Sequence, residues 1–509
     1  MRLPYLNETS EKAKKYVVAF RGINYGEGWQ EGELEQSHNL SSEKFPCLTP
    51  RANRTKVAQY ANPTTLHAKG ELLVIDGTDV IYNGKTVGAV TAGRKQTATV
   101  GNYVIIFPDK KYYNVVTDEF GGMEETFSAS NLVFTDSEIT GTGFNFKAGD
   151  AVTISGCTVA PENNRTLDNA VIIRSATSTK LTFLADTFTA STETGTVTIK
   201  RDVPDLDFIC ESNYRLWGTS GKTIYGSKYA DPFNFFYFDT GTADASYWIE
   251  VGTDGEFTGC IPYSSHICFF KEDTVHKLYG SKPSNFQIST SKVHGVQAGC
   301  ERSMCVINEQ LIYKGVNGIY SYTGGVPDLI SESFGLERYT DAAAACNGER
   351  YYVSMKRGEE YSLFCYDVLR NLWLREDSTH ALDMTFFEGC VHFINEAGEL
   401  YRIDGTEDKT GVEWSATFCP FNETMNERKG YSKFHVRLDL DAGAWFAIDI
   451  KTDRDTKWRN IFTTYNERAK TISVPIIPTR CDSVSIRLHG KGGCVVRTLI
   501  REFSTGSDV

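Results

Sequence analysis

The sequence predicts an all-β protein: a six- or seven-bladed β-propeller with a small β-barrel or sandwich inserted in it and a β-sandwich at the C-terminal end. Three observations lead to this fold class. A hairpin pattern recurs along most of the chain, one internal segment differs in composition, and the C-terminal region alternates between apolar and polar residues. The 509 residues include 44 glycines and 12% aromatic residues, which favours strands joined by tight turns over helix bundles.

The recurring pattern is an apolar strand, a glycine or charged turn, and a second strand that carries an aromatic residue, usually tyrosine. Each copy is typical of a β-hairpin. The copies lie at residues 72–84 and 103–116 and begin again at Arg215, Ile267, Leu311, Tyr361 and Val391. The later copies recur about every 30–50 residues, as propeller blades do. Unrelated hairpins in β-sandwiches are the alternative interpretation.

Composition divides the chain further. The segment between the second and third hairpins is rich in Thr, Ser and Gly, and long insertions at surface loops cost little. Near the C-terminus, runs such as FHVRLDLDAGAWFAIDIKTD are typical of an antiparallel sandwich or jelly roll. We expect residues 1–123 to hold the N-terminal segment and first blades, 124–201 the inserted β domain, 202–411 the remaining blades, and 412–509 the C-terminal sandwich.

Ring closure is a separate expectation. A terminal strand can complete a blade built from the other end of the chain, which removes an open edge. Val17, Val18 and Phe20 form an apolar strand before the turn at residues 22–24. We expect this strand, or residues 72–75, to pair with the last hairpin at residues 391–403.

Charge and hydropathy exclude some classes of protein. The net charge of −12 argues against wrapping nucleic acid with a broadly basic surface. No apolar run reaches the roughly 18 residues of an ordinary transmembrane helix, so we expect no membrane anchor. The start MRLPYLNETSEKAKKYVVAF lacks the apolar core and cleavage site of a signal peptide. We therefore expect folding in a cytoplasm.

Motifs that carry catalysis are absent from the sequence. It has no GxSxG, Walker loop, HExxH or EF-hand loop, and its nine histidines lack metal-ligand spacing. We expect no enzyme activity, no catalytic residues, no metal site and no cofactor. Acidic clusters do occur, and we favour solvated turns for them over a loop calcium site or a glycosidase acid/base pair. They are Asp202, Asp205 and Asp207; Asp449, Asp453 and Asp455; and Asp118, Glu119, Glu124 and Glu125.

Cysteines and aromatic residues are the other notable side chains. The 13 cysteines are scattered without a CxxC pair, so we expect free, buried thiols. An aromatic-rich stretch is expected to fill blade cores, with stacking on sugar rings as the alternative. It comprises Trp217, Tyr225, Phe233, Phe235, Phe236, Tyr237, Phe238, Tyr247 and Trp248.

The most distinctive stretch is VAFRGINYGEGWQEGELEQSHNLSSEKFPCLTPRANR near the N-terminus. Its key residues are Phe20, Gly22, Ile23, Asn24, Asn39, Leu40, Phe45, Pro46, Leu48, Pro50, Arg51 and Arg54. The stretch resembles the opening of phage and prophage tail and head–tail connector proteins. RLWGTSGKTIYGSKYADPFNFF and LIYKGVNGIYSYTGGVPDLIS resemble prophage virion proteins. The order of domains is similar to that of tail hub, or packaged-DNA stabilisation, β-propeller proteins.

This resemblance implies a virion structural protein: a tail hub or head–tail adaptor subunit that extends the DNA channel below the portal and helps to retain packaged DNA. The implied partners are further copies in a hexameric ring, portal or adaptor ring proteins, tail fibre, spike or needle proteins, and DNA that passes without sequence-specific binding. The implied location is the virion tail, after assembly in the bacterial cytoplasm. A receptor- or carbohydrate-binding tail protein is the main alternative; a propeller glycosidase is disfavoured because no Asp-box turn is complete.

Overall fold

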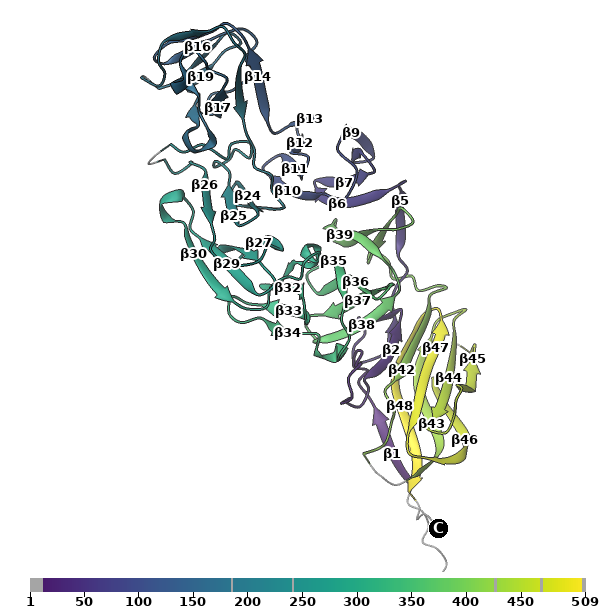
Figure 1. Ribbon diagram of the computed structural model, residues 1–509. Coiled ribbons are helices and arrows are strands. Elements are labelled where there is room, and N and C mark those ends of the chain that lie inside the picture. The colour runs from purple at the N-terminus through teal and green to yellow at the C-terminus, as the bar shows by residue number, and fades with distance from the viewer. Residues whose placement is uncertain (1–11, 185, 240–241, 425–427, 467–469, 506–509) are drawn as a thin grey trace, which may run out of the picture.

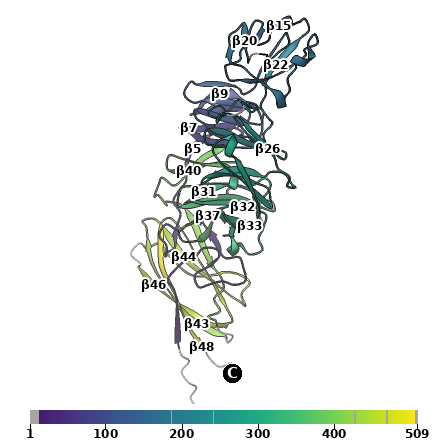
Figure 2. The same ribbon diagram turned by 90° about the vertical axis from the view of Figure 1, so that its left-hand side faces the viewer.

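The computed structural model describes residues 12–184, 186–239, 242–424, 428–466 and 470–505. It is all-β, as the sequence predicts. Three parts lie in a row: the inserted domain at one end, a propeller in the middle and a sandwich at the other end (Figures 1 and 2). No helix in these ranges is long and apolar enough to cross a membrane.

Seven four-stranded antiparallel sheets form the propeller, so the chain has seven blades. Blade 1 consists of β6 (Pro63–Lys69), β7 (Glu71–Asp76), β8 (Asp79–Tyr82) and β9 (Lys85–Ala89). Blade 2 consists of β10 (Gln96–Val100), β11 (Tyr103–Phe107), β12 (Lys111–Asn114) and β13 (Glu119–Gly122). Blade 3 consists of β23 (Phe208–Ser212), β24 (Arg215–Ser220), β25 (Thr223–Gly226) and β26 (Tyr247–Glu250), and blade 4 of β27 (Gly259–Tyr263), β28 (His266–Phe270), β29 (Thr274–Tyr279) and β30 (Gln287–Lys292).

The other blades follow in chain order. Blade 5 is β31 (Cys305–Ile307), β32 (Gln310–Gly315), β33 (Gly318–Tyr322) and β34 (Asp328–Leu329); blade 6 is β35 (Thr340–Cys346), β36 (Arg350–Arg357), β37 (Glu360–Asp367) and β38 (Leu372–Asp377); blade 7 is β39 (Ala381–Phe387), β40 (Cys390–Asn395), β41 (Glu399–Ile403) and β5 (Thr55–Gln59). Short 3₁₀ turns η3 (Pro283–Asn285), η4 (Glu301–Ser303) and η5 (Glu332–Phe334) connect some strands.

The predicted hairpins are the centres of these blades. Six of the seven copies are the second and third strands of a blade, and the copy at Tyr361 is the third and fourth strands. The first copy shows why the pattern works. Its apolar residues Leu73, Val74 and Ile75 are buried, and Gly77 in the turn has a φ of +63°, which glycine adopts without steric cost. A short apolar run that is buried on both faces, followed by a turn glycine, therefore marks this blade hairpin.

The ring is closed by an N-terminal strand, but not by the strand that we expected. β5 pairs with β41 and completes blade 7. Val17 instead lies in β1 (Lys12–Val17), which pairs with β48 (Cys494–Thr505) in the sandwich, and residues 72–75 belong to blade 1. β5 has the sequence TKVAQ and no fully buried residue. An outer strand of this kind carries no apolar signal that sequence analysis can follow.

The inserted domain has its own core. Its sheets are β14 (Glu125–Ala129), β22 (Val197–Arg201), β17 (Ala151–Ser155) and β18 (Val171–Ile172), and β19 (Ser175–Ala176), β20 (Lys180–Thr182), β16 (Glu138–Thr140), β15 (Leu132–Phe134) and β21 (Ser191–Glu193). Turns η1 (Pro161–Asn163) and η2 (Leu167–Asn169) also lie here. Phe134, Ile139, Val152, Leu181 and Ile199 form one buried cluster between the sheets.

The C-terminal sandwich takes two strands from the N-terminal part of the chain. One sheet is β1, β48, β43 (Lys429–Leu440) and β46 (Thr471–Cys481); the other is β2 (Leu34–His38), β42 (Glu413–Phe418), β47 (Val484–Lys491), β44 (Trp445–Thr452) and β45 (Arg459–Thr464). Phe434, Phe446 and Leu488 lie in the core between them. The chain therefore passes through the sandwich before it enters the propeller.

Candidate functional site at the propeller–sandwich junction

The junction is built by the chain segment that leaves the sandwich and enters the propeller. After β2, the short strands β3 (Leu40–Ser41) and β4 (Thr49–Pro50) pair with each other, and the chain then continues into β5 of blade 7. Asn39 makes the first turn with a φ of 52°, a conformation that asparagine tolerates better than most residues. This segment lies against β38 of blade 6.

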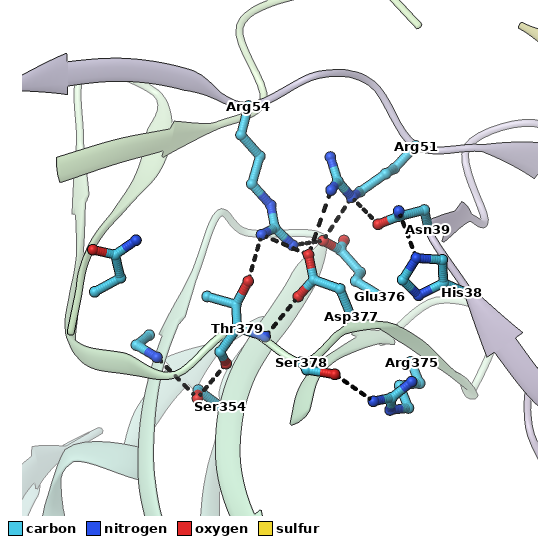
Figure 3. Close-up of polar contacts among 12 residues, drawn as sticks. His38, Asn39, Arg51, Arg54, Ser354, Arg375, Glu376, Asp377, Ser378 and Thr379 are labelled. Atoms are coloured by element: carbon cyan, nitrogen blue, oxygen red, sulfur yellow. Dashed lines mark hydrogen bonds and ion pairs between the residues drawn. The ribbon is translucent and has the colours of Figure 1, made fainter. Parts of the chain in front are cut away.

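Four charged side chains meet where this segment contacts blade 6 (Figure 3). Arg54 lies 2.6 Å from a carboxylate oxygen of Glu376 and 2.9 Å from one of Asp377. Arg51 lies 3.5 Å and 3.4 Å from the same two carboxylates. The side chains of Arg54 and Glu376 are only 9% and 4% exposed. Two positive and two negative charges thus balance in a buried position, as buried charges require.

Neutral groups complete this network and connect it to the sandwich. The Asn39 side chain accepts a hydrogen bond from Nε of Arg51 at 2.8 Å and donates one to the Glu413 carbonyl at 2.8 Å. The Asn39 backbone N–H donates to the Glu376 carbonyl at 2.6 Å. Because Glu413 begins β42 of the sandwich and Glu376 lies in blade 6, Asn39 contacts both domains. A single side chain therefore helps to fix their relative position.

The charge network is stable in its ionised form. Burial raises the pKa of Asp377, but Arg54, Thr379 and Arg51 together lower it below the ordinary value of an aspartate. Burial lowers the pKa of Arg54, and the carboxylates of Glu376 and Asp377 more than compensate, so its pKa is raised. For these two residues the opposite charges outweigh burial, whereas burial and the charge of Arg54 lower the pKa of Arg51 from its ordinary value. The junction therefore keeps its ion pairs at neutral pH.

A second contact lies beside the charge network. The N–H of Ile23 donates to the Trp373 carbonyl at 2.7 Å, and Gly22 packs so closely that an added Cβ would lie 2.3 Å from that oxygen. The Trp373 ring is buried and packs against Phe334 with ring centroids 5.0 Å apart. Glycine at position 22 is thus required by close approach of two backbones.

Three clefts flank the junction, with volumes of about 370, 640 and 880 Å³. The smallest is lined by residues that include Arg54, Arg350 and Asp404. The largest is lined by residues that include Arg357, Arg375 and Glu337. Both signs of charge occur in each of these two. Mixed polar linings suit the side chains of a protein partner, which carry both signs, more than a single small ion.

The structure brings together residues of the distinctive N-terminal stretch. Asn39, Arg51 and Arg54 lie in the charge network, Gly22 and Ile23 contact Trp373, and Leu48 exchanges two backbone hydrogen bonds with Val496 of β48. Sequence reasoning missed their partners, Glu376 and Asp377. The only signal was the charged run RED at the end of the Tyr361 hairpin, which has no spacing that points to Arg51 or Arg54.

Another buried ion pair lies within the propeller, between Arg302 and Asp383. Nη1 of Arg302 lies 3.2 Å from a carboxylate oxygen of Asp383 and donates to the carbonyls of Thr64 and Leu382 at 3.1 and 3.2 Å. Nη2 donates to the Lys95 carbonyl at 3.0 Å. These residues come from blades 1 and 7 and from the start of blade 2. Arg302 therefore ties blades together beside a central cleft of about 300 Å³.

Each acidic cluster contains at least one carboxylate that pairs with a cation of the protein itself. Ion pairs join Asp202 to Lys200 at 2.6 Å, Asp205 to Lys110 at 2.7 Å, Asp118 to Lys85 at 2.6 Å and Asp449 to Arg487 at 2.5 Å. Such pairs satisfy the carboxylates without a bound metal. In the part of the chain that the structure describes, no group of three or more His, Cys, Asp or Glu side chains is placed to hold a metal ion.

The aromatic stretch mostly fills blade cores. Trp217, Phe235 and Phe236 are buried in blade clusters, which confirms the core interpretation for these three residues, whereas Tyr237 is buried in a cluster with Ala151 of the inserted domain. Trp248 is 48% exposed. All 13 cysteines are free, and ten of them are buried, as expected for small apolar side chains.

Comparisons with known proteins find no matching family model and no curated protein with significant sequence similarity. Among solved structures, the chain is similar to BamB from Moraxella catarrhalis, with 9% identity, a TM-score of 0.32, and coverage of 69% of this chain and 97% of that chain. Hsv2 from Kluyvelomyces marxianus has 11% identity and a TM-score of 0.28 and covers 56% of this chain and 76% of that chain. An exo-β-1,3-galactanase from Phanerochaete chrysosporium has 9% identity and a TM-score of 0.23, with coverage of 56% and 92%. Similarity at this level carries no information on ligand or activity.

Proposed function

We propose that this chain is a structural subunit of a phage virion, a tail hub or head–tail adaptor protein that extends the DNA channel below the portal and helps to retain packaged DNA. The junction carries this proposal. Asn39, Arg51 and Arg54, through which the sequence resembles such proteins, form the buried network that fixes the propeller against the sandwich. Domains of one chain usually move relative to each other unless their interface prevents it. A subunit of a particle needs such a fixed orientation.

The division of charge along the chain supports assembly between copies. Residues 202–411 contain 17 Lys and Arg against 31 Asp and Glu, whereas residues 412–509 contain 15 against 12. Opposite potentials attract, so the sandwich of one copy meets the propeller of another more favourably than like parts meet. A closed ring of identical subunits uses two different surfaces of each subunit. This division of charge provides two such surfaces.

The proposed assembly is a homo-oligomeric ring in the virion tail, hexameric by the resemblance. The ring docks on portal or adaptor ring proteins and carries fibre, spike or needle proteins. An acidic chain suits a channel through which DNA slides, because phosphate contacts with basic side chains would hold the DNA in place. The mixed clefts beside the junction provide surfaces for the neighbouring proteins.

Imaging of particles from a phage that lacks this gene tests the proposal. We expect heads that have lost their DNA and lack a complete tail, and we expect the purified protein added back to restore filled particles. Intact tails that retain DNA would overturn the proposal. Complete, filled particles that fail only to bind host cells would instead support the receptor-binding alternative. Glycan-array binding by the purified protein would then be the next measurement.

A further inference from the structure

Four cysteines lie as two pairs at boundaries between neighbouring blades. Cys210 in β23 of blade 3 faces Cys260 in β27 of blade 4, and Cys305 in β31 of blade 5 faces Cys346 in β35 of blade 6. In both cases the strand is the first of its blade, and the two first strands contact each other. The cysteines are 50 and 41 positions apart in the sequence, so only the propeller fold brings them together.

The Cys305–Cys346 pair combines proximity with access. The two thiols lie close enough to perturb each other's pKa, and Sγ of Cys346 donates a hydrogen bond at 3.5 Å to the carbonyl of Val306, the residue next to Cys305 in the chain. Both residues are partly exposed. The neighbouring Cys305 lowers the pKa of Cys346 to about 7, whereas Cys346 and burial raise that of Cys305. Cys346 is therefore the more acidic thiol of the pair, and a thiolate is the reactive form of cysteine.

The Cys210–Cys260 pair is a matched comparison within the same molecule. Its thiols also lie close together across a blade boundary, but the two residues are only 7% and 6% exposed. Cys260 and burial both raise the pKa of Cys210. Thiol–disulfide exchange needs a thiolate that the reagent can reach. The two pairs thus share their position in the fold and differ in exposure, so we expect them to differ in reactivity.

We propose that Cys305 and Cys346 are a modification site at which a small-molecule disulfide, such as oxidised glutathione, installs a reversible disulfide that links blades 5 and 6. The Cys346 thiolate attacks one sulfur of the reagent, which forms a mixed disulfide and releases one thiolate. Cys305 then gives up its proton and attacks the Cys346 sulfur, which forms the Cys305–Cys346 bond and releases a second thiolate. The two leaving thiolates take up the two protons of the cysteine pair. The protein loses two electrons, and the reagent is reduced to two thiols.

The consequence is a covalent link across one boundary of the ring. Without it, blades 5 and 6 are joined by the polypeptide between their strands and by packing. A disulfide between them restricts the unfolded chain and keeps the boundary closed. This property goes beyond the proposed virion role and does not depend on it. It would let the protein fold with free thiols in a reducing compartment and become more resistant to unfolding in an oxidising one.

The test is oxidation of the purified full-length protein with oxidised glutathione at neutral pH, without denaturant. We expect two of the 13 thiols to be lost first, the intact mass to fall by about 2 Da, and Tm to rise by about 5 °C. Peptide mapping should find Cys305 linked to Cys346. Dithiothreitol should reverse all three changes. Crosslinks that first join other cysteines, or persistent glutathione adducts without a crosslink, would overturn the proposal.

Single variants separate the two steps. Cys305→Ser removes the resolving thiol, so a glutathione adduct on Cys346 should persist and add about 305 Da to the mass. Cys346→Ser should abolish the fast reaction. Cys47→Ser is the matched control, because Cys47 is partly exposed and lies elsewhere in the fold, and it should leave the crosslink intact. An equally fast loss of two thiols in Cys346→Ser would also contradict the proposal.

Discussion

The propeller is attached to its two neighbours in different ways. At the sandwich, strands β1 and β2 pair with β48 and β42 before the chain enters the propeller, and Asn39 bonds to Glu413, 374 positions later. At the inserted domain, β14 and β22 leave and return as an antiparallel pair. There the domain also packs on the segment between β25 and β26 of blade 3: Ala151 shares a buried cluster with Tyr237 and Ala245, and the Asn234 side chain accepts from the Ala151 N–H at 3.0 Å.

This difference determines which part can exist without the others. The inserted domain closes its own core between its two sheets, so its attachment requires only its two ends to stay together. The sandwich lacks two of its strands unless the N-terminal segment is present, and that same segment supplies β5 to blade 7. Sandwich and propeller are therefore expected to unfold together, whereas the inserted domain is expected to unfold separately.

The largest expected effect comes from breaking the charge network. Glu376→Ala leaves Arg54 and Arg51 with only Asp377, and removing one partner of a buried pair typically costs about 3–5 kcal/mol. We expect the free energy of unfolding of the propeller–sandwich unit to fall by that amount in urea denaturation. Glu359→Ala is the control, since the side chain of Glu359 is 95% exposed, and it should change the value by less than about 0.5 kcal/mol. Equal effects of the two variants would show that the network does not hold the junction.

A smaller effect is expected at the backbone contact beside the network. Gly22→Ala places a methyl group 2.3 Å from the Trp373 carbonyl oxygen, and overpacking of this kind costs about 1–3 kcal/mol. Gly28→Ala in the same segment is the matched control, because an added Cβ there meets no atom within 4 Å. Tm from calorimetry should fall for the first variant only. An unchanged Tm for Gly22→Ala would mean that the backbones at Gly22 and Trp373 can move apart without a loss of stability, which would contradict the prediction.

A pH dependence of similar or smaller size is expected from Asp377. Its pKa is lowered in the folded protein from the ordinary 3.8. Its ionised form therefore contributes stability that is fully present above that value and is lost as the pH falls through the folded pKa. Wild type should be more stable than Asp377→Asn at pH 7, and the difference should shrink toward pH 2. Urea denaturation of both proteins across this range measures it; a difference independent of pH would contradict the prediction.

The smallest effect on the propeller is expected from removing the inserted domain. Deleting residues 124–201 and joining the ends with a Gly-Ser linker removes Asp150 and Arg201 together, so neither is left unpaired. The main calorimetric transition should shift by no more than about 2 °C, because a surface loop tolerates a change of length at little cost. Residues 124–201 made alone should unfold cooperatively. Insoluble protein after the deletion would contradict this prediction, because it would show that the propeller needs the inserted domain as well as the sandwich in order to fold.

The blade hairpins could be predicted from the sequence because the residues that define them lie close together in the chain. In the hairpin at residues 72–84, buried Leu73 and Ile75, the turn at Gly77 and the second strand all lie within a few positions of each other. A short apolar run between turns marks a strand that is buried on both faces, as Leu73, Val74 and Ile75 are, and a turn glycine marks where the chain reverses. The same reasoning anticipated the inserted β domain and the C-terminal sandwich strands, and a count of hairpins matched the number of blades.

What the sequence by itself determined, then, is each element and its buried face. Only the tertiary structure decided which elements become neighbours across the chain. The apolar content of β5 is too low to predict that it pairs with β41. Nothing near Arg54 in the sequence predicts its contact with Glu376, which lies 322 positions away. The Cys305–Cys346 pair likewise exists only because two blades pack side by side. Periodicity describes how a segment meets a core, whereas the partner of an edge strand or a charge is set by packing of the whole chain.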